Sequence, residues 1–259
     1  MTKMVKPLIL VTNDDGISSP GIRVLIRQMN RLGDVVVVAP DSAQSGMSHA
    51  ITISDSLRCE PIFMDSGPQR EFSCSGTPAD CIKIGVHEIL EKKPDMIVSG
   101  INHGSNASVN VLYSGTMAAA IEGALQGVPS IGFSLLDYSW DADFSEAENY
   151  VYKIASMVLK KGMPNGVCLN ANIPKISANR YKGIRVCRQT IGKWMEKFDK
   201  RVDPNGKSYY WMTGEFKDLD GSDETDIWAL NNNYVTVVPI QFDLTSYKSI
   251  IDINKILEL

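Results

Sequence analysis

The sequence predicts an α/β fold with a mostly parallel sheet covered by helices, and two observations support it. Between residues 7 and 174, short apolar runs rich in β-branched residues alternate with longer segments of helical periodicity. This order is typical of strands joined by right-handed helical crossovers. The short runs are apolar on both faces, as expected of strands that are buried between two layers of helices.

Strands are expected where an apolar run is short and bounded by turn residues. The main ones are 7–12, 34–40, 94–100, 128–135 and 166–174, with shorter patterns at 51–57, 59–64 and 70–76. Helices are expected where apolar residues recur every three or four positions. They are 20–33, 77–90, 115–127 and 145–162. Pro20 suits the first turn of the first helix, and Ser19 precedes it as a candidate cap.

The alternation stops after residue 180. Two long strand patterns rich in Trp and Tyr flank the turn sequence Asp-Pro-Asn-Gly at 203–206, which predicts a protruding hairpin. A strand at 232–240 and a terminal helix at 246–257 follow. We therefore divide the chain into an α/β core, residues 1–180, and a strand-rich appendage, residues 181–259, used in oligomerisation.

A long hairpin that exposes aromatic side chains is poorly stable alone and tends to be buried against a partner. We therefore expect at least a homodimer, in which the hairpin at 193–217 or the terminal helix crosses between subunits.

Composition narrows the function classes. The formal net charge is −4, which gives no electrostatic reason to expect a nucleic acid polymer as partner. No apolar stretch approaches the ~20 residues needed to span a membrane, so no membrane partner is expected. The five cysteines are an odd number without a Cys-x-x-Cys pair, a pattern typical of reduced thiols in a cytoplasmic protein.

Polar loops follow several predicted strands, and ligands of parallel sheets bind at the carboxyl ends of strands. Asp14 and Asp15 follow the first strand, Ser45 the second, and Asn102 the strand at 94–100. Two adjacent carboxylates repel each other unless a positive charge joins them. If the loops meet, these four residues offer only oxygen ligands, which suit Mg²⁺ or Mn²⁺. The alternative for Asp-Asp-Gly alone is an ordinary turn.

The sequence "YSGTMAAAIEG" predicts a second feature of the same site. Ser114, Gly115 and Thr116 lie at the start of the helix at 115–127. The free N–H groups and dipole of a helix N-terminus favour an anion, and glycine allows close approach. The alternative is an ordinary helix cap by Ser114 or Thr116. A cation facing such a helix end is the arrangement that phosphoryl transfer requires.

Other nucleotide motifs do not occur: there is no G-x-x-x-x-G-K-[ST] and no G-x-G-x-x-G. His49 and His103 flank the candidate site and could steer a leaving group, or they are solvated loop residues.

Taken together, the motifs resemble the signature blocks of the SurE (survival protein E) family of nucleotidases. The matching blocks are "TNDDGISSPGI", "APDSAQSGMSHAIT", "GTPADCIKIG", "PDMIVSGINHGSN" and "YSGTMAAAIEG". The resemblance continues through "YKGIRVCR" and "TDIWALNNNYVTVVPIQFDLT", so it covers essentially the whole chain in order.

The resemblance implies a Rossmann-like core, an exchanged C-terminal portion that builds dimers or tetramers, and metal-dependent hydrolysis of nucleoside 5′- and 3′-monophosphates, with short polyphosphate as a further substrate. By motif, the metal ligands would be Asp14, Asp15, Ser45 and Asn102. The phosphate site would include Asn102, Asn106, Ser114, Gly115 and Thr116. No role transfers to His49 or His103, where the family pattern is less strict.

We therefore expect a phosphomonoesterase that uses a metal-activated water, with one divalent cation per subunit and Asp14 or Asp15 accepting the proton of the water. Thr116 and nearby N–H groups would stabilise the phosphoryl oxygens. Two alternatives remain: a nonenzymatic nucleotide-binding sensor, and a phosphotransferase in which an aspartate attacks phosphorus directly.

Overall fold

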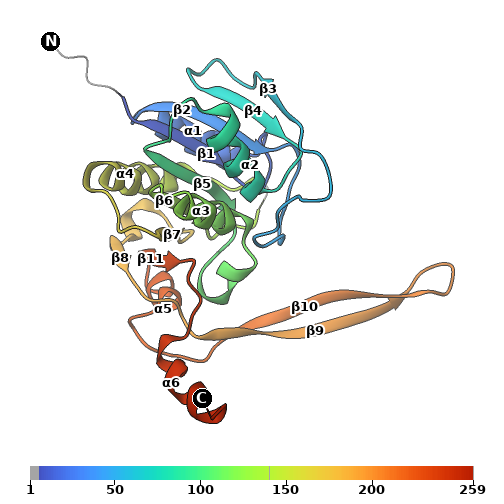
Figure 1. The fold of residues 1–259 in the computed structure, drawn as a ribbon. Helices are drawn as coiled ribbons and strands as arrows, with labels where there is room; N and C mark the ends of the chain where they lie inside the picture. The colour runs from blue at the N-terminus through green and yellow to red at the C-terminus, as the bar shows by residue number, and fades with distance from the viewer. Residues whose placement is uncertain (1–5, 140, 259) are drawn as a thin grey trace.

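The computed structural model describes residues 6–139 and 141–258. Residues 1–5 and 140 of the expected core, and residue 259 of the expected appendage, lie outside the described residues. Within the described part of the chain nine strands form one mostly parallel sheet flanked by helices, which confirms the predicted α/β fold (Figure 1). In spatial order the strands are β3 (Cys59–Ile62), β4 (Arg70–Cys74), β2 (Asp34–Pro40), β1 (Leu8–Thr12), β5 (Met96–His103), β6 (Ser130–Leu135), β7 (Val167–Ile173), β11 (Val235–Gln241) and β8 (Ile184–Val186).

The central strand β1 lies where the order of strands reverses. Every pairing from β4 through β7 is parallel, and Leu10 of β1 is aligned with Val36 of β2 and with Ile97 of β5. From β1 the chain proceeds to β2 and β4 on one side before it starts β5 on the other. Such a reversal opens a crevice at the carboxyl ends of the two strands, here β1 and β5.

Helices cover both faces of this sheet. α1 (Pro20–Asn30) packs beside α4 (Ser145–Lys161), and α2 (Pro78–Ile84) packs beside α3 (Gly115–Leu125) (Figure 1). Ile9 of β1 enters the core cluster under α1 and α4, whereas Leu10 enters the cluster under α2. Successive strand residues point to opposite faces, so a strand covered on both sides has to be apolar throughout.

The strand predicted at 51–57 is wrong. The backbone N–H of Thr52 donates to the Asp80 carboxylate at 3.1 Å, and the Thr52 hydroxyl donates to the same group at 2.7 Å. Because a side chain of α2 binds this segment, it crosses the surface as a loop and not as a ladder partner of β4. The helix predicted at 77–90 is also shorter: α2 ends at Ile84 and a π-turn, η1 (Gly85–Ile89), follows.

The region after residue 180 contributes to the sheet as well as to the appendage. β11 pairs antiparallel with β7, from Thr236 opposite Asn172 to Gln241 opposite Val167, and β8 pairs with β11. The sheet therefore includes segments that we had assigned to the appendage. A short helix before β11, α5 (Asp226–Asn231), is absent from the sequence prediction.

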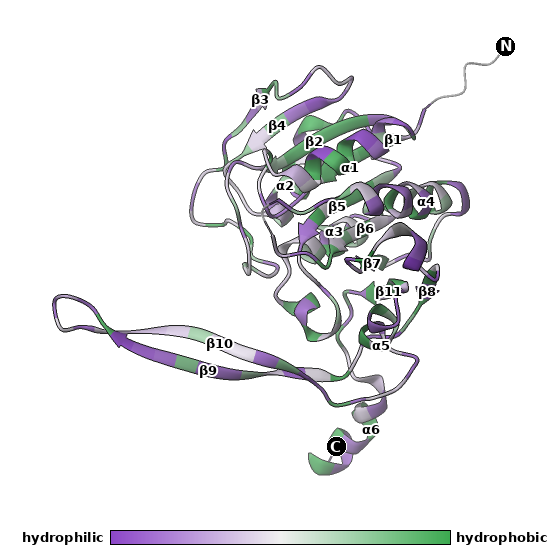
Figure 2. Cartoon of the chain, turned by 180° about the vertical axis from the view of Figure 1, so that it is seen from behind, coloured by the Kyte–Doolittle hydropathy of each residue, from purple (hydrophilic) through white to green (hydrophobic). Residues whose placement is uncertain are grey.

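The predicted hairpin is present. β9 (Gly192–Val202) and β10 (Ser208–Asp218) form a separate two-stranded ribbon, hereafter the arm, which protrudes from the body (Figure 1). Its two strands mix apolar and polar residues (Figure 2), and Trp211 is 59% exposed. Helix α6 (Ile250–Ile256) follows a 3₁₀ turn, η4 (Tyr247–Ser249), and has no buried residue. No helix among the described residues has the length and apolar character to cross a membrane.

Candidate active site

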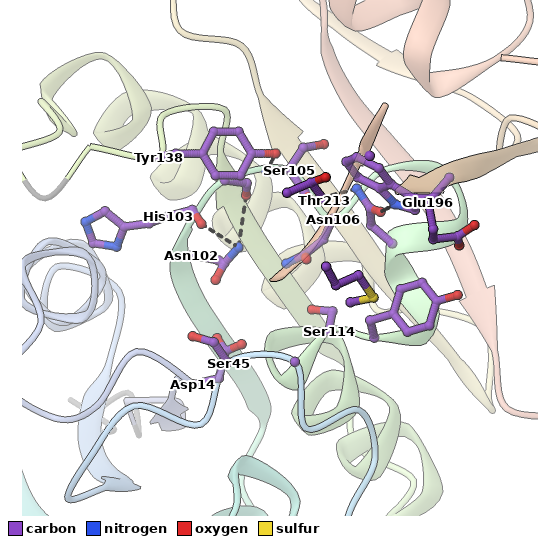
Figure 3. Close-up of a pocket in the computed structure, with 17 residues that line it drawn as sticks. Asp14, Ser45, Asn102, His103, Ser105, Asn106, Ser114, Tyr138, Glu196 and Thr213 are labelled. Atoms are coloured by element: carbon purple, nitrogen blue, oxygen red, sulfur yellow. Dashed lines mark hydrogen bonds between the residues drawn. The ribbon is translucent and has the colours of Figure 1, made fainter. Parts of the chain in front are cut away.

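The crevice at the ends of β1 and β5 contains a cavity of about 680 Å³. Figure 3 shows side chains from several loops pointing into it. Asp15, Gly115 and Thr116 are not among the described residues that line it. The predicted site residues that do line it are Asp14, Ser45, Asn102, Asn106 and Ser114.

Asp14 is buried at the end of β1, with 4% of the residue exposed. Its backbone carbonyl accepts a hydrogen bond from the Gln44 N–H at 2.7 Å. Its carboxylate oxygen Oδ1 accepts one from the Thr116 hydroxyl at 2.5 Å. Burial, together with the charge of Asp15, raises the pKa of Asp14 to about 6 despite the hydrogen bonds from Thr116. A cation beside this carboxylate would favour its charged form.

Asp15 faces a histidine of β5. Its Oδ2 lies 3.2 Å from the backbone nitrogen of His103 and 3.0 Å from Nδ1 of the same residue. The His103 ring lies edge-on to Phe144 with centroids 5.0 Å apart, and His103 lines the cavity. Sequence reasoning missed this pair because the two residues are 88 positions apart and only the pairing of β1 with β5 brings them together.

Asn102 presents its amide oxygen to the cavity. β5 shifts register against β6 between Ser99 and Asn102, a bulge that redirects the end of the strand. The Nδ2 of Asn102 donates to the carbonyls of His103 at 3.2 Å and Gly104 at 2.9 Å. With the nitrogen held there, Oδ1 points toward Asp14 (Figure 3). A carbonyl-type oxygen fixed in this way is a suitable ligand for a hard cation.

Ser45 lies in the exposed loop that follows β2, and contacts at both ends hold this loop. Gln44 bonds the Asp14 carbonyl, and the Thr77 hydroxyl donates to the Ala50 carbonyl at 2.8 Å. His49 Nε2 lies 3.1 Å from Glu122 of α3. His49 is not among the described residues that line the cavity, so its contact with Glu122 indicates a role in holding the loop.

Glu122 of α3 holds the Ser45 loop through its contact with His49. Although burial opposes its ionisation, hydrogen bonds from His49 and Lys83 lower the pKa of Glu122 to about 2. The Lys83 ammonium lies 2.8 Å from the carboxylate. The charged form therefore persists at neutral pH and connects α2, α3 and the Ser45 loop.

Helix α3 begins directly beside Asp14. The Ser114 hydroxyl oxygen accepts from the Met117 N–H at 3.0 Å, so Ser114 is the cap, and its hydroxyl proton remains available to a ligand. A Cβ on Gly115 would lie 2.7 Å from the Asp14 Cβ, so only glycine allows this approach. Both the N–H and the hydroxyl of Thr116 contribute hydrogen bonds to Asp14. Thr116 therefore positions Asp14: its hydroxyl proton is used in that bond, and Thr116 is not among the described residues that line the cavity.

Asn106 is held by polar side chains of the sheet. Its N–H donates to Asn172 Oδ1 at 2.9 Å, its Nδ2 donates to Ser134 Oγ at 2.9 Å, and its carbonyl accepts from Asn170 Nδ2 at 2.8 Å. Asn170 and Asn172 are buried and bond each other at 2.8 Å. A buried network in which each member has a partner holds its loop rigidly, so Asn106 enters the cavity in one defined orientation.

The arm provides the opposite wall of the cavity, which sequence reasoning missed because it assigned the arm to assembly alone. Trp194 of β9 donates from Nε1 to Asn110 Oδ1 at 2.8 Å. Nearby, the buried Asp226 accepts from the N–H groups of Ser108 and Thr190, which ties the start of the arm to the loop after β5. No motif or spacing marks these residues in the sequence. The arm residues that line the cavity are Trp194, Glu196, Met212, Thr213 and Gly214 (Figure 3).

The donor set fits a hard divalent cation. Among the described residues no group of three or more His, Cys, Asp or Glu could hold a metal ion. The candidate site instead combines carboxylate, hydroxyl and amide oxygens, from Asp14, Ser45 and Asn102 around the cavity and from Asp15, which contacts the cavity residue His103. Oxygen ligands with few charges are typical of Mg²⁺ sites that keep several waters. The raised pKa of Asp14 and the fixed Asn102 oxygen are the features expected at such a site.

Comparison with known proteins is consistent with this geometry. The family model for Survival protein SurE matches residues 9–196. Proteins named 5′-nucleotidase SurE from Flavobacterium psychrophilum and Christiangramia forsetii are 58% and 59% identical, covering 97% and 96% of this chain and 98% and 96% of theirs. A crystal structure of the SurE protein from Aquifex aeolicus matches with a TM-score of 0.83 and 40% identity, covering 97% of this chain and 100% of that one. This chain therefore belongs to the SurE family.

Proposed function

We propose that this chain is a 5′-nucleotidase that hydrolyses nucleoside 5′- and 3′-monophosphates, and short polyphosphate as a further substrate, with one Mg²⁺ or Mn²⁺ per subunit. One observation carries the proposal: Asp14, Asn102 and the start of α3 face a single cavity at the strand reversal. The names of its relatives, 5′-nucleotidase SurE, support the nucleotide as substrate. We place the enzyme in the cytoplasm, as the cysteine pattern predicts.

The phosphate group is expected at the N-terminus of α3. The first N–H groups of a helix have no intrahelical partner, and the helix dipole favours an anion there. In α3 the N–H groups of Thr116 and Met117 already bond Asp14 and Ser114, so we assign the Gly115 N–H to the phosphate. The Ser114 hydroxyl can donate to a phosphoryl oxygen while its oxygen accepts from Met117. Asn106, held by the buried asparagines, offers a second polar group on the same wall. These groups would stabilise the charge that develops on the phosphoryl oxygens.

The carboxylates are expected to hold the cation and to manage the proton of the attacking water. When bound, a divalent cation polarises the phosphoryl oxygens and lowers the pKa of the attacking water. Asp14 lines the cavity, whereas Asp15 is not among the described residues that line it and is oriented by His103. We therefore assign Asp14 as the residue that accepts the proton, and Asp15 as the residue that balances the charge of the cation. Thr116 keeps the Asp14 carboxylate in place.

The nucleoside is expected to lie against the arm. Trp194 and Met212 give the far wall of the cavity an aromatic and an apolar surface, and Trp194 is fixed by Asn110. A nucleobase stacked on an aromatic ring gains ~1–3 kcal/mol without any need to read the identity of the base. The arrangement therefore favours nucleotides over phosphate esters without a base.

We also propose that the protein is a homodimer or homotetramer in which C-terminal elements are exchanged. The outer arm and α6 are exposed although they carry large apolar residues. Trp211 is 59% exposed and Ile251 65%. Isolated two-stranded ribbons are marginally stable in water, so a partner subunit is the expected cover.

The first prediction tests activity and metal dependence. Phosphate release from nucleoside monophosphates should stop with a chelator and return with Mg²⁺ or Mn²⁺. Asp14→Asn and Asp15→Asn, which each remove one negative charge, should lower kcat/KM by at least about 100-fold, or about 2.7 kcal/mol. The assay is colorimetric phosphate release, with the exposed Asp34→Asn as matched control.

Three outcomes would contradict this assignment. Tight nucleotide binding without phosphate release would indicate a sensor. A phosphoenzyme trapped by acid quench would indicate direct attack by an aspartate. Full activity of Asp14→Asn at limiting metal would remove this residue from the site.

The second prediction concerns the stability of the metal-free protein. The pKa of Asp14 is about 6 in the fold and 3.8 in the unfolded reference. As pH rises from about 4 to 6 the unfolded state ionises first, so the native state loses stability. The loss is complete above about pH 6 and is on the order of 2–3 kcal/mol.

Asp14→Asn cannot ionise, so with a chelator it should be more stable than the wild type at pH 7.5 and similar to it near pH 4. Urea unfolding across pH measures both free energies, and Asp34→Asn should follow the wild type. Added Mg²⁺ should raise the melting temperature of the wild type more than that of Asp14→Asn. A wild type that is the more stable protein at pH 7.5 without metal would refute this prediction.

The third prediction separates Trp194 from the rest of the arm. Trp194→Ala should raise KM for AMP by about 10-fold, because it removes a stacking surface worth about 1.4 kcal/mol. Hydrolysis of ribose 5-phosphate, which has no base, should change little. Trp211→Ala, on the outer arm, is the matched control. Equal losses on both substrates would show that Trp194 supports the fold and not the base.

The fourth prediction concerns assembly. Light scattering at micromolar concentration should give at least twice the mass of one chain. Phe198→Lys with Trp211→Lys should shift the mass toward the monomer if the arm is exchanged. Ile251→Lys with Ile253→Lys should do so if α6 is exchanged. A monomeric mass for the wild type would reject the assembly proposal.

A further inference from the structure

We propose that Cys59 and Cys74 are a redox-reactive pair that closes to a reversible disulfide when a peroxide oxidises the protein. Both are free thiols in this structure, as are the other three cysteines. The inference does not depend on the proposed function, because it rests on the pairing of β3 with β4 at the edge of the sheet.

The register of this ribbon places the two cysteines directly opposite each other. β3 pairs antiparallel with β4, and Cys59 is aligned with Cys74. The next pair along, Arg58 and Ser75, is hydrogen bonded, because the Ser75 N–H donates to the Arg58 carbonyl at 2.9 Å. Hydrogen-bonded and non-hydrogen-bonded pairs alternate in antiparallel ladders. Cys59 and Cys74 are therefore a non-hydrogen-bonded pair.

This type of pair has the geometry that a disulfide needs. Opposite Cα atoms of a non-hydrogen-bonded pair lie about 4.5 Å apart, within the range of about 4.4–6.8 Å found across disulfides. Side chains of directly opposite residues also project from the same face of the ribbon. Pro61 lies two residues further along β3, opposite Phe72, so it has the same pair type as Cys59. Proline has no N–H to donate to the opposite strand, which fits a non-hydrogen-bonded pair.

The surroundings favour reaction at this pair. Cys59 is partly exposed, so a small oxidant can reach it, whereas Cys74 and Cys81 are fully buried beside it. Hydrogen bonding from the Cys81 thiol, opposed by burial, lowers the pKa of Cys74 to about 7. Burial and the neighbouring Cys74 raise the pKa of Cys59 to about 11. Cys74 is thus partly thiolate at neutral pH and can accept the proton of Cys59.

The reaction balances with one peroxide. The Cys59 sulfur attacks a peroxide oxygen while its proton passes to the Cys74 thiolate; the O–O bond breaks and the leaving hydroxide takes a proton from solvent to form water. Cys59 is then a sulfenic acid. The Cys74 sulfur attacks the Cys59 sulfur, the S–OH bond breaks, and the second water leaves with the Cys74 proton. Two thiols and one hydrogen peroxide thus become one disulfide and two waters, and the two sulfurs are oxidised.

The bond would form at the base of the loop that carries Ser45. The loop leaves the sheet at Asp41, whose N–H donates to the Cys74 carbonyl at 2.8 Å, and it returns at Cys59. A covalent link between Cys59 and Cys74 would fix both ends of the loop to β4. It would also restrict the unfolded chain, so the oxidised protein should have the higher melting temperature.

Peptide mapping tests the proposal directly. The full-length protein is treated with hydrogen peroxide, its remaining thiols are alkylated under denaturing conditions, and it is digested with trypsin. Cys59 lies in the peptide 59–70, whereas Cys74 and Cys81 lie in 71–83. We expect these two peptides to be joined, with Cys81 alkylated, and to separate after dithiothreitol. The melting temperature should rise on oxidation and return on reduction.

Variants define the outcome. Cys59→Ser and Cys74→Ser should each abolish the joined peptide and the shift in melting temperature. Cys187→Ser, outside this cluster, should keep both. Cys81→Ala should keep the link but slow its formation, because it removes the thiol donor, the largest of the effects that favour the Cys74 thiolate. No joined peptide in the wild type under peroxide, or a bond from Cys81 instead of Cys74, would overturn the proposal.

Discussion

The position of β1 between β2 and β5 is the constraint on which the candidate site depends. The ends of these strands carry Asp14, the Ser45 loop and Asn102, and only their adjacency brings the three together. The reversal of strand order also leaves space above them for the start of α3. A helix N-terminus and a set of oxygen ligands therefore face one cavity, an arrangement suited to an anionic ester and a cation.

Much of the remaining structure keeps this polar site in place within an apolar fold. A buried Asp14 beside Asp15 is unfavourable in the absence of a cation, and Thr116 offsets part of that cost. Gly115 lets α3 approach Asp14, and buried asparagines of β7 orient Asn106. These residues hold in place side chains that line the cavity, so substituting them should lower activity by displacing those side chains.

The arm has two surfaces with different expected roles. Its base closes the cavity through Trp194, and Asp226 ties this base to the loop after β5. Its outer half is exposed and carries the aromatic residues that a partner subunit would cover. Both halves belong to one antiparallel ladder, from Gly192 opposite Asp218 at the base to Val202 opposite Ser208 at the tip.

The sequence by itself determined the α/β class, the principal strands, the hairpin and the nature of the oxygen donors, because these depend on local periodicity, turn residues and side-chain chemistry. It also identified Asp14, Ser45, Asn102, Asn106 and Ser114, which the structure brings to one cavity. Only the tertiary structure decided that Thr116 serves Asp14, that Asp15 pairs with His103, and that Trp194 closes the cavity. These contacts join residues far apart in the chain, and strand order and packing, not local pattern, set which of them meet. The wrong strand prediction at 51–57 has the same explanation. The segment has a strand-like pattern, but hydrogen bonds from Thr52 to Asp80 of helix α2 hold it as a loop.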